Sequence, residues 1–274
     1  MKTLIIFSLI FVFGCASSPK EKTKAEKKAE IYYGKGTNDL LNGQYTSALK
    51  NLLEANSLKP NDSDILNNLG MAYFFKTKEG TAIRYVKKAL EINPKNTKAR
   101  LNLATLYTNT NQLEEAKKQF HIVLEDLTYE GQYKTYYNLG QLYLKTKNVQ
   151  KALNYFKQSL SENPQYCASH FFMGEIYFQR QEYKNALESY KSAGYGVCYN
   201  NPKPIYHQAL SYIQLKEYDT ARVKLEEVIE RFKPTEYGKK AENQLQALNS
   251  ANLGMQFKLQ PNRKKTRNIL SPDF

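Results

Sequence analysis

The stretch from residue 69 to residue 94, LGMAYFFKTKEGTAIRYVKKALEINP, decides the architecture of this chain. Gly70 and Ala82 are small residues at which two helices can approach each other closely, whereas larger neighbours such as Val86 fill the space between them. Pro94 ends the unit, because proline cannot continue a helix. The stretch therefore predicts a hairpin of two helices followed by a turn.

The same spacing returns with a period of about 34 residues, which is the mark of a repeat architecture. Clear copies centre on Leu103, Leu139 and Met173, and weaker copies flank them, so that six copies cover residues 29–234. A further segment, 235–250, carries leucine and alanine at helical spacing and predicts a capping helix.

At these positions the chain resembles the tetratricopeptide repeat family, whose Leu-Gly, Tyr, Ala, aromatic, Ala, Pro signature has the same spacing. The resemblance implies an all-α fold, a right-handed α-solenoid of about six helical hairpins with a C-terminal capping helix. One hairpin cannot bury its apolar face alone, so stacking on its neighbours is what stabilises the array. We expect the repeat domain to cover residues 29–250. The basic stretch 251–274 has no period and is expected to be a disordered tail.

The N-terminus predicts export. Lys2 precedes an apolar run at residues 4–13, which is shorter than the roughly 20 residues that a membrane-spanning helix needs. A positive start followed by a short apolar stretch is typical of a signal peptide, here expected at residues 1–14.

The end of that segment, Val12-Phe13-Gly14-Cys15, resembles the lipobox of bacterial lipoproteins, with an ordinary signal peptide and an incidental cysteine as the alternative. The resemblance implies cleavage before Cys15 and attachment of lipid to its sulfur. Ala16, in place of the Asp that retains lipoproteins at the inner membrane, implies the periplasmic face of the outer membrane. Residues 15–28 are polar and are expected to form a flexible tether.

The residues give little support to catalysis. The histidines His121, His170 and His207 lie in three different repeats and are not at metal-ligand spacing, so structural roles are the better interpretation and no metal is expected. The chain has neither a phosphate-binding loop nor a nucleophile elbow, so we expect no enzyme activity, cofactor or small-molecule substrate. The net charge of +14 is spread along the helices, and an exported lipoprotein meets little nucleic acid, so no nucleic-acid partner is expected.

Two cysteines of the repeat domain leave alternatives open. Cys167 opens one predicted helix and Cys198 lies just ahead of another, at the same edge of a solenoid. An oxidising compartment permits a disulfide, but spacing alone does not establish the short Cα separation that it needs. The alternative is two buried free thiols.

The partner-binding surface is inferred from the family, in which the first helix of each hairpin lines the concave side. Asparagines occupy the same position in three successive repeats, where their amides could bind an extended peptide backbone, with simple exposure to solvent as the alternative. Aromatic side chains on the same face can supply the buried anchors that dominate binding energy. The expected site therefore comprises Asn68, Phe75, Asn102, Tyr137, Asn138, Phe172 and Phe178.

The lipobox, the short tether, the six repeats and the basic tail together resemble the pilotin lipoproteins of type IV pilus biogenesis, the PilF and Tgl kind. The irregular junction Leu127-Thr128-Tyr129 before an Asn-Leu-Gly helix adds to that resemblance. It implies a protein client, an outer-membrane secretin whose assembly or localisation the lipoprotein assists. Two alternatives remain: a periplasmic scaffold for outer-membrane protein insertion, and a regulator of cell-wall enzymes.

Overall fold

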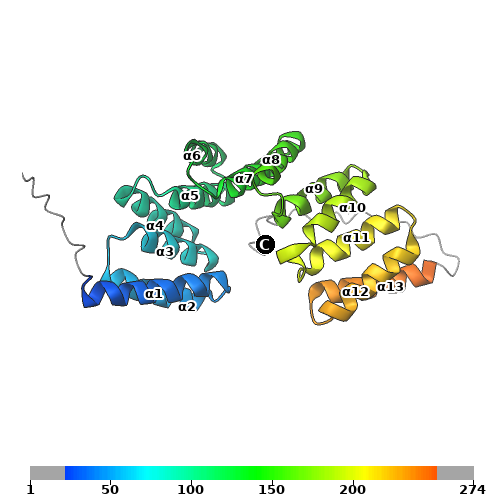
Figure 1. The fold of residues 1–274 in the computed structure, drawn as a ribbon, viewed down its shortest axis with the longest axis horizontal. Helices are drawn as coiled ribbons and strands as arrows, with labels where there is room; N and C mark the ends of the chain where they lie inside the picture. Colours follow the sequence, from blue (N-terminus) through cyan, green and yellow to red (C-terminus); the bar gives the residue numbers. More distant parts are fainter. Residues whose placement is uncertain (1–21, 252–274) are drawn as a thin grey trace, which may run out of the picture.

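The computed structural model describes residues 22–251, which form thirteen α-helices and one short 3-10 helix, with no strand in that range. The helices run from the N-terminal to the C-terminal end of the array (Figure 1). Their bounds are α1 (Lys24–Leu41), α2 (Tyr45–Leu58), α3 (Ser63–Phe75), α4 (Glu79–Ile92), α5 (Thr97–Asn109), α6 (Leu113–Glu125), α7 (Gln132–Lys145), α8 (Val149–Glu162), α9 (Cys167–Gln179), α10 (Tyr183–Ala193), η1 (Gly196–Cys198), α11 (Pro202–Gln214), α12 (Tyr218–Phe232) and α13 (Glu236–Ala251).

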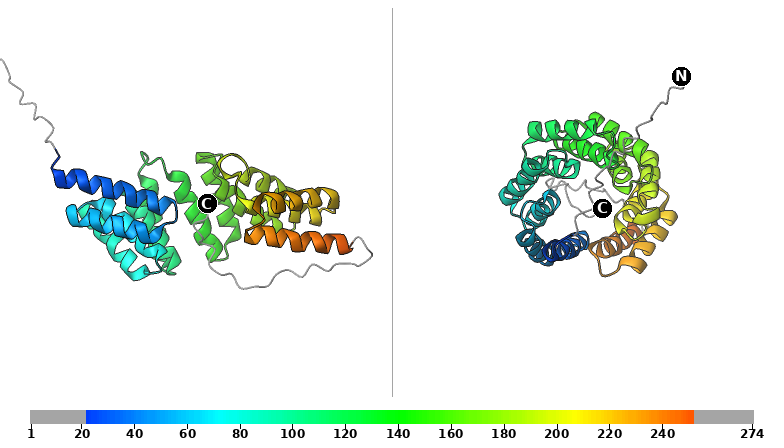
Figure 2. Two further views of the ribbon diagram at one scale, coloured as in Figure 1. Left: turned by 90° about the horizontal axis from the view of Figure 1, so that it is seen from below. Right: turned by 60° about the vertical axis from the view of Figure 1, so that its left-hand side comes forward.

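The helices pack as six consecutive hairpins. Each odd-numbered helix from α1 to α11, here called an A helix, packs against the B helix that follows it, and each hairpin then packs against the next. Helix α13 packs on α12 and α11 and caps the last hairpin. Viewed along the array, the hairpins follow one another around a ring (Figure 2). The predicted solenoid of six tetratricopeptide-type hairpins with a capping helix is confirmed.

The first helix begins inside the segment expected to be a tether. Helix α1 starts at Lys24 because Thr23 and Glu26 form a reciprocal capping box, in which each side chain accepts a hydrogen bond from the other residue's backbone N–H. The ordered body thus starts a few residues before the expected boundary at residue 29. The predicted signal peptide, Cys15 and the tail from residue 252 onward lie outside the described residues.

The small residues of the repeat signature lie where the two helices of a hairpin touch. The alanines of the B helices are fully buried, as seen for Ala82, Ala116, Ala152, Ala186 and Ala221. A Cβ atom added to Gly140 would lie 2.5 Å from a ring carbon of Phe156, and one added to Gly174 would lie 2.6 Å from a ring carbon of Tyr190. The close approach predicted from the sequence is therefore present.

Every A helix ends in the same way, which defines one edge of the solenoid. In five hairpins a non-glycine residue between the helices has a positive φ of 58° to 65°, and Gly43 takes this role in the first. In these five hairpins the backbone carbonyl of the signature tyrosine, for example Tyr107, accepts a hydrogen bond from the N–H five residues later, at Gln112. We call this the A-to-B edge, and the opposite edge, where B helices lead into A helices, the B-to-A edge.

Two connections on the B-to-A edge depart from the regular turn. Between α6 and α7, the Asp126 carboxylate accepts hydrogen bonds from the Thr97 and Thr128 hydroxyls, while Leu127 is 90% exposed. Between α10 and α11, Cys198 forms a disulfide with Cys167 at the start of α9, with a Cα–Cα distance of 6.4 Å. Of the two alternatives that the sequence left open, the disulfide is the one observed.

Candidate partner-binding surface

The A helices lie on the inner side of the curved array. In a curved stack, elements on the inner side come closer to each other than those on the outer side. Helix α1 lies against α3, α3 against α5, α5 against α7, and α11 against α13, whereas no two B helices of the described body approach to the same extent. The ring in Figure 2 therefore has A helices toward its centre.

Asparagine side chains link the first three A helices through hydrogen bonds. Asn102 Nδ2 donates to Asn67 Oδ1 at 2.9 Å, and Asn67 Nδ2 donates to Asn68 Oδ1 at 3.2 Å. Asn68 Nδ2 in turn donates to the Thr37 hydroxyl at 2.9 Å. Asn67 is buried, whereas Asn68 and Asn102 are partly buried. Because an amide nitrogen offers two donors and Asn102 uses one of them, this asparagine chain keeps donor capacity. It orders the surface and can still bind a peptide backbone.

Asn138 on α7 occupies the position equivalent to Asn68 and Asn102, but it is not part of the asparagine chain. Its side chain is partly buried and makes no hydrogen bond with another described residue. At the next equivalent position, on α9, the residue is Phe172. The inner surface therefore changes from amides on α3, α5 and α7 to an aromatic side chain on α9.

Aromatic rings fill the junction between the fourth and fifth hairpins. The Tyr137 ring packs edge-on against Tyr166 at 5.4 Å and lies 5.9 Å from both Phe156 and Phe172. Burial, and then the neighbouring Tyr166, raise the pKa of the Tyr137 hydroxyl well above its usual value, so it stays protonated. Tyr137 and Phe172 thus serve the packing between hairpins and offer a partner only part of their surface.

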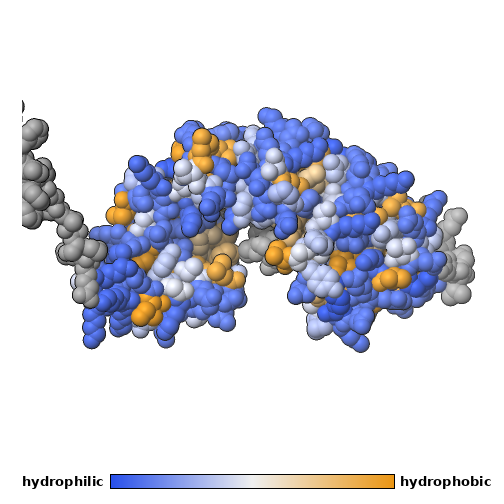
Figure 3. All heavy atoms as spheres, in the orientation of Figure 1, coloured by the Kyte–Doolittle hydropathy of each residue, from blue (hydrophilic) through white to orange (hydrophobic). Residues whose placement is uncertain are grey.

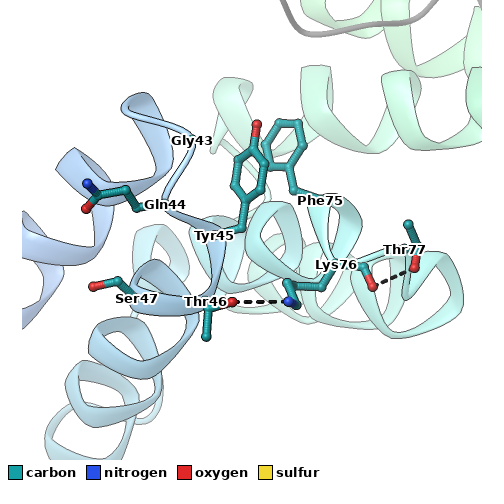
Figure 4. Close-up of a pocket in the computed structure, with 8 residues that line it drawn as sticks. All are labelled: Gly43, Gln44, Tyr45, Thr46, Ser47, Phe75, Lys76 and Thr77. Atoms are coloured by element: carbon teal, nitrogen blue, oxygen red, sulfur yellow. Dashed lines mark hydrogen bonds between the residues drawn. The ribbon is translucent and has the colours of Figure 1, made fainter.

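Phe75 lines a cavity at the A-to-B edge rather than on the floor of the inner surface. Its ring stacks on Tyr45 with centroids 4.4 Å apart, and the two rings stand side by side at the cavity (Figure 4). The cavity has a volume of about 630 Å³ and is lined by residues of the first two hairpins, Gly43, Gln44, Tyr45, Thr46, Ser47, Phe75, Lys76 and Thr77. Phe178 lies near the same edge, in the fifth hairpin, against Tyr183. The seven residues predicted from the sequence therefore form several separate groups along the array.

A polar cluster between α9, α10 and α11 was missed by the sequence analysis. Tyr190 donates a hydrogen bond of 2.6 Å to Glu175 Oε1, and His207 Nδ1 lies 3.0 Å from the same oxygen. Burial raises the pKa of the Glu175 carboxyl, but His207 and the hydrogen bonds outweigh it and hold the pKa below its usual value. Glu175 therefore carries a negative charge at neutral pH, with the His207 ring beside it.

The outer surface has a different character. The molecule is mostly hydrophilic on the face drawn in Figure 3, with hydrophobic residues exposed beside its central hollow. The outer B helices carry exposed charged residues such as Lys87, Lys88, Glu114, Glu115 and Lys118. None of the helices within residues 22–251 is long and apolar enough to span a bilayer.

Comparison with known proteins agrees with the repeat architecture. Residues 79–135, 133–166 and 205–234 match tetratricopeptide repeat families. The chain is 38% identical over 112 residues to the anaphase-promoting complex subunit CDC16 of Saccharomyces cerevisiae, a match that covers 38% of this chain and 13% of that protein. The chain thus spans only a small part of the length of this curated relative.

Solved structures of pilus proteins have a similar fold. PilF of Pseudomonas aeruginosa superimposes with a TM-score of 0.63 at 19% identity, over 81% of this chain and all of that chain. PilW, a widely conserved type IV pilus biogenesis factor, superimposes with a TM-score of 0.65 at 17% identity, over 77% of this chain and 97% of that chain. At these identities the likeness concerns the fold. The chain therefore contains tetratricopeptide repeats, and its fold is the solenoid of a protein-interaction scaffold.

Proposed function

We propose that this protein is a lipoprotein of the outer membrane that binds a secretin through its inner surface and assists secretin assembly or localisation in type IV pilus biogenesis. Attachment is through lipid on Cys15, and the protein carries out no catalysis. The observation that carries the proposal is the combination of a lipobox-like segment with a six-hairpin solenoid that matches nearly the full length of two pilus proteins in fold.

The inner surface has the chemistry that an extended protein segment needs. The asparagine chain presents amide groups across three neighbouring helices, and amides pair with a peptide backbone irrespective of its sequence. Phe75, Phe172 and Phe178 are partly exposed and offer apolar contacts along the same array. Glu175 adds one negative charge, which favours a client segment with a basic side chain near the fifth hairpin.

Replacing Cys15→Ser tests the membrane attachment. Without the sulfur no lipid can be added, so we expect the protein to leave the outer-membrane fraction and the secretin to lose its assembled form there. The measurement is the amount of both proteins in fractionated envelopes, with mass spectrometry of the N-terminal peptide to detect acylation. Ser18→Ala is the matched control, because it changes a residue close to Cys15 but leaves the cysteine and the lipobox intact.

A Cys15→Ser protein that is still lipid-modified in the outer membrane would contradict attachment through Cys15. Normal secretin assembly in cells that lack this protein would contradict the proposed client. The fold would then serve another partner, and a scaffold for outer-membrane protein insertion or for cell-wall enzymes would be the next hypothesis to test.

A further inference from the structure

The connection between α10 and α11, residues 194–201, exposes an unusual group of apolar side chains. Tyr195 is 77% exposed, Val197 93% and Tyr199 58%. No other five-residue stretch within residues 22–250 holds even two large hydrophobic residues that are exposed. Single exposed apolar residues are ordinary, but a group of them marks a contact surface.

This connection, here called the stapled loop, is held in place from several sides. The disulfide ties Cys198 to the start of α9. The Arg231 guanidinium lies 3.9 Å from the centre of the Tyr199 ring and donates a hydrogen bond of 2.7 Å to the Tyr199 carbonyl oxygen. Gly196 has a φ of +62°, which lets the chain turn sharply between the exposed side chains. The loop is therefore held with Tyr195 and Val197 exposed and with the Tyr199 ring against Arg231.

We propose that the stapled loop is a second membrane contact, at which Tyr195, Val197 and Tyr199 enter the lipid–water interface. The inference rests on the proposed membrane attachment, which brings the body close to a bilayer. Tyrosine is enriched at membrane interfaces because its ring is apolar and its hydroxyl remains hydrated. A protruding loop with tyrosines on both sides of a valine has that chemistry.

The position of the loop in the solenoid agrees with this contact. The loop lies on the B-to-A edge, and the N-terminal end of α1 lies on the same edge, since α1 is the first A helix. The nine Cα–Cα steps from Cys15 to Lys24 span at most about 30 Å even when fully extended. An anchor at Cys15 would therefore keep the start of α1, which lies on this edge, near the lipid.

The neighbourhood of the loop suits anionic headgroups. Lys191 lines a cavity of about 500 Å³ beside Tyr195 and Val197, together with His170. Its ion pair with Glu188 is exposed and hence weak, so Lys191 can also approach a lipid phosphate. Three side chains bind a bilayer only weakly. The tether makes the contact intramolecular, however, and so raises the effective concentration of lipid at the loop.

The chain has no tryptophan, so a single introduced tryptophan reports its own surroundings. The full chain with Val197→Trp is held by its N-terminal region on vesicles of phosphatidylethanolamine and phosphatidylglycerol that contain brominated lipid, a quencher of tryptophan fluorescence. Leu41→Trp is the matched control, because Leu41 is 82% exposed but ends α1 at the A-to-B edge. Sedimentation with the vesicles is checked first for both variants.

We expect brominated lipid to reduce the fluorescence of the Val197→Trp protein by about twofold or more, as for a side chain at the interface, and to leave the Leu41→Trp protein unchanged. The Val197→Trp emission should also shift to shorter wavelength when the protein is on vesicles. Sedimentation with the vesicles but no quenching of the Val197→Trp protein, or equal quenching of both variants, would overturn the proposal. A blue shift that occurs only when a secretin is added would assign the loop to a protein partner, and would overturn it as well. Because attachment is measured separately, a failure of the loop contact is distinguishable from a failure of the anchor.

Discussion

Replacing Cys198→Ser is expected to lower the free energy of unfolding by about 3 kcal/mol, because the disulfide closes a loop of 31 residues that the unfolded chain could otherwise explore. Cys198 is partly exposed, so serine fits the site with little loss of packing. The measurement is chemical denaturation monitored by circular dichroism.

A reducing agent provides the matched control. It should bring the unfolding midpoint of the natural protein down to that of the Cys198→Ser variant and should leave the variant unchanged. An identical midpoint for the oxidised natural protein and the variant would contradict a stabilising role for the bridge.

Replacing Gly140→Leu is expected to lower the free energy of unfolding by about 3 kcal/mol through overpacking of the fourth hairpin. The Cβ atom alone would lie within 2.8 Å of three carbons of the Phe156 ring. This ring is fully buried, with Tyr137 and Phe172 each 5.9 Å away, so it cannot move aside without disturbing the next hairpin.

Gly34→Leu is the comparison variant, because a Cβ atom at Gly34 would meet nothing within 4 Å. Gly34 is an exposed residue within α1, and replacing glycine in a helix by leucine typically stabilises it by about 0.5 to 1 kcal/mol. The two leucines should thus shift the denaturation midpoint in opposite directions. Equal shifts would mean that Gly140 is not at a close helix contact.

The repeat period was sufficient to predict the fold, since it placed the small residues, the signature tyrosines and the ends of the hairpins. It was insufficient for contacts between hairpins, because these depend on how far each hairpin is rotated against the next. Asn68 and Thr37 are 31 residues apart, Asn102 and Asn67 are 35 apart, and Cys198 and Cys167 are 31 apart. Polar or reactive residues about one period apart can thus meet across neighbouring repeats, and this signal would also have paired Glu175 with His207.

The aromatic residues also show that the repeat period does not predict contacts between hairpins. The period placed Tyr137 and Phe172 on A helices, and that placement is correct. The extent to which they are covered depends on Tyr166, which precedes α9 and packs edge-on against Tyr137. Because this contact crosses from one hairpin to the next, the sequence analysis overestimated the surface that Tyr137 offers to a partner.

The proposed function requires the inner surface and its A-to-B edge to bind a secretin. It is tested most directly by placing a photoreactive phenylalanine analogue at Phe75 or Phe178 and, as an outer-surface control, at Lys118, which is an exposed residue of α6. After illumination of intact cells, mass spectrometry identifies what each position has captured. We expect the analogue at Phe75 or Phe178 to be cross-linked to a secretin and the analogue at Lys118 not to be. Cross-linking of the secretin at Lys118 but at neither phenylalanine would place the binding surface on the outer helices and contradict the account.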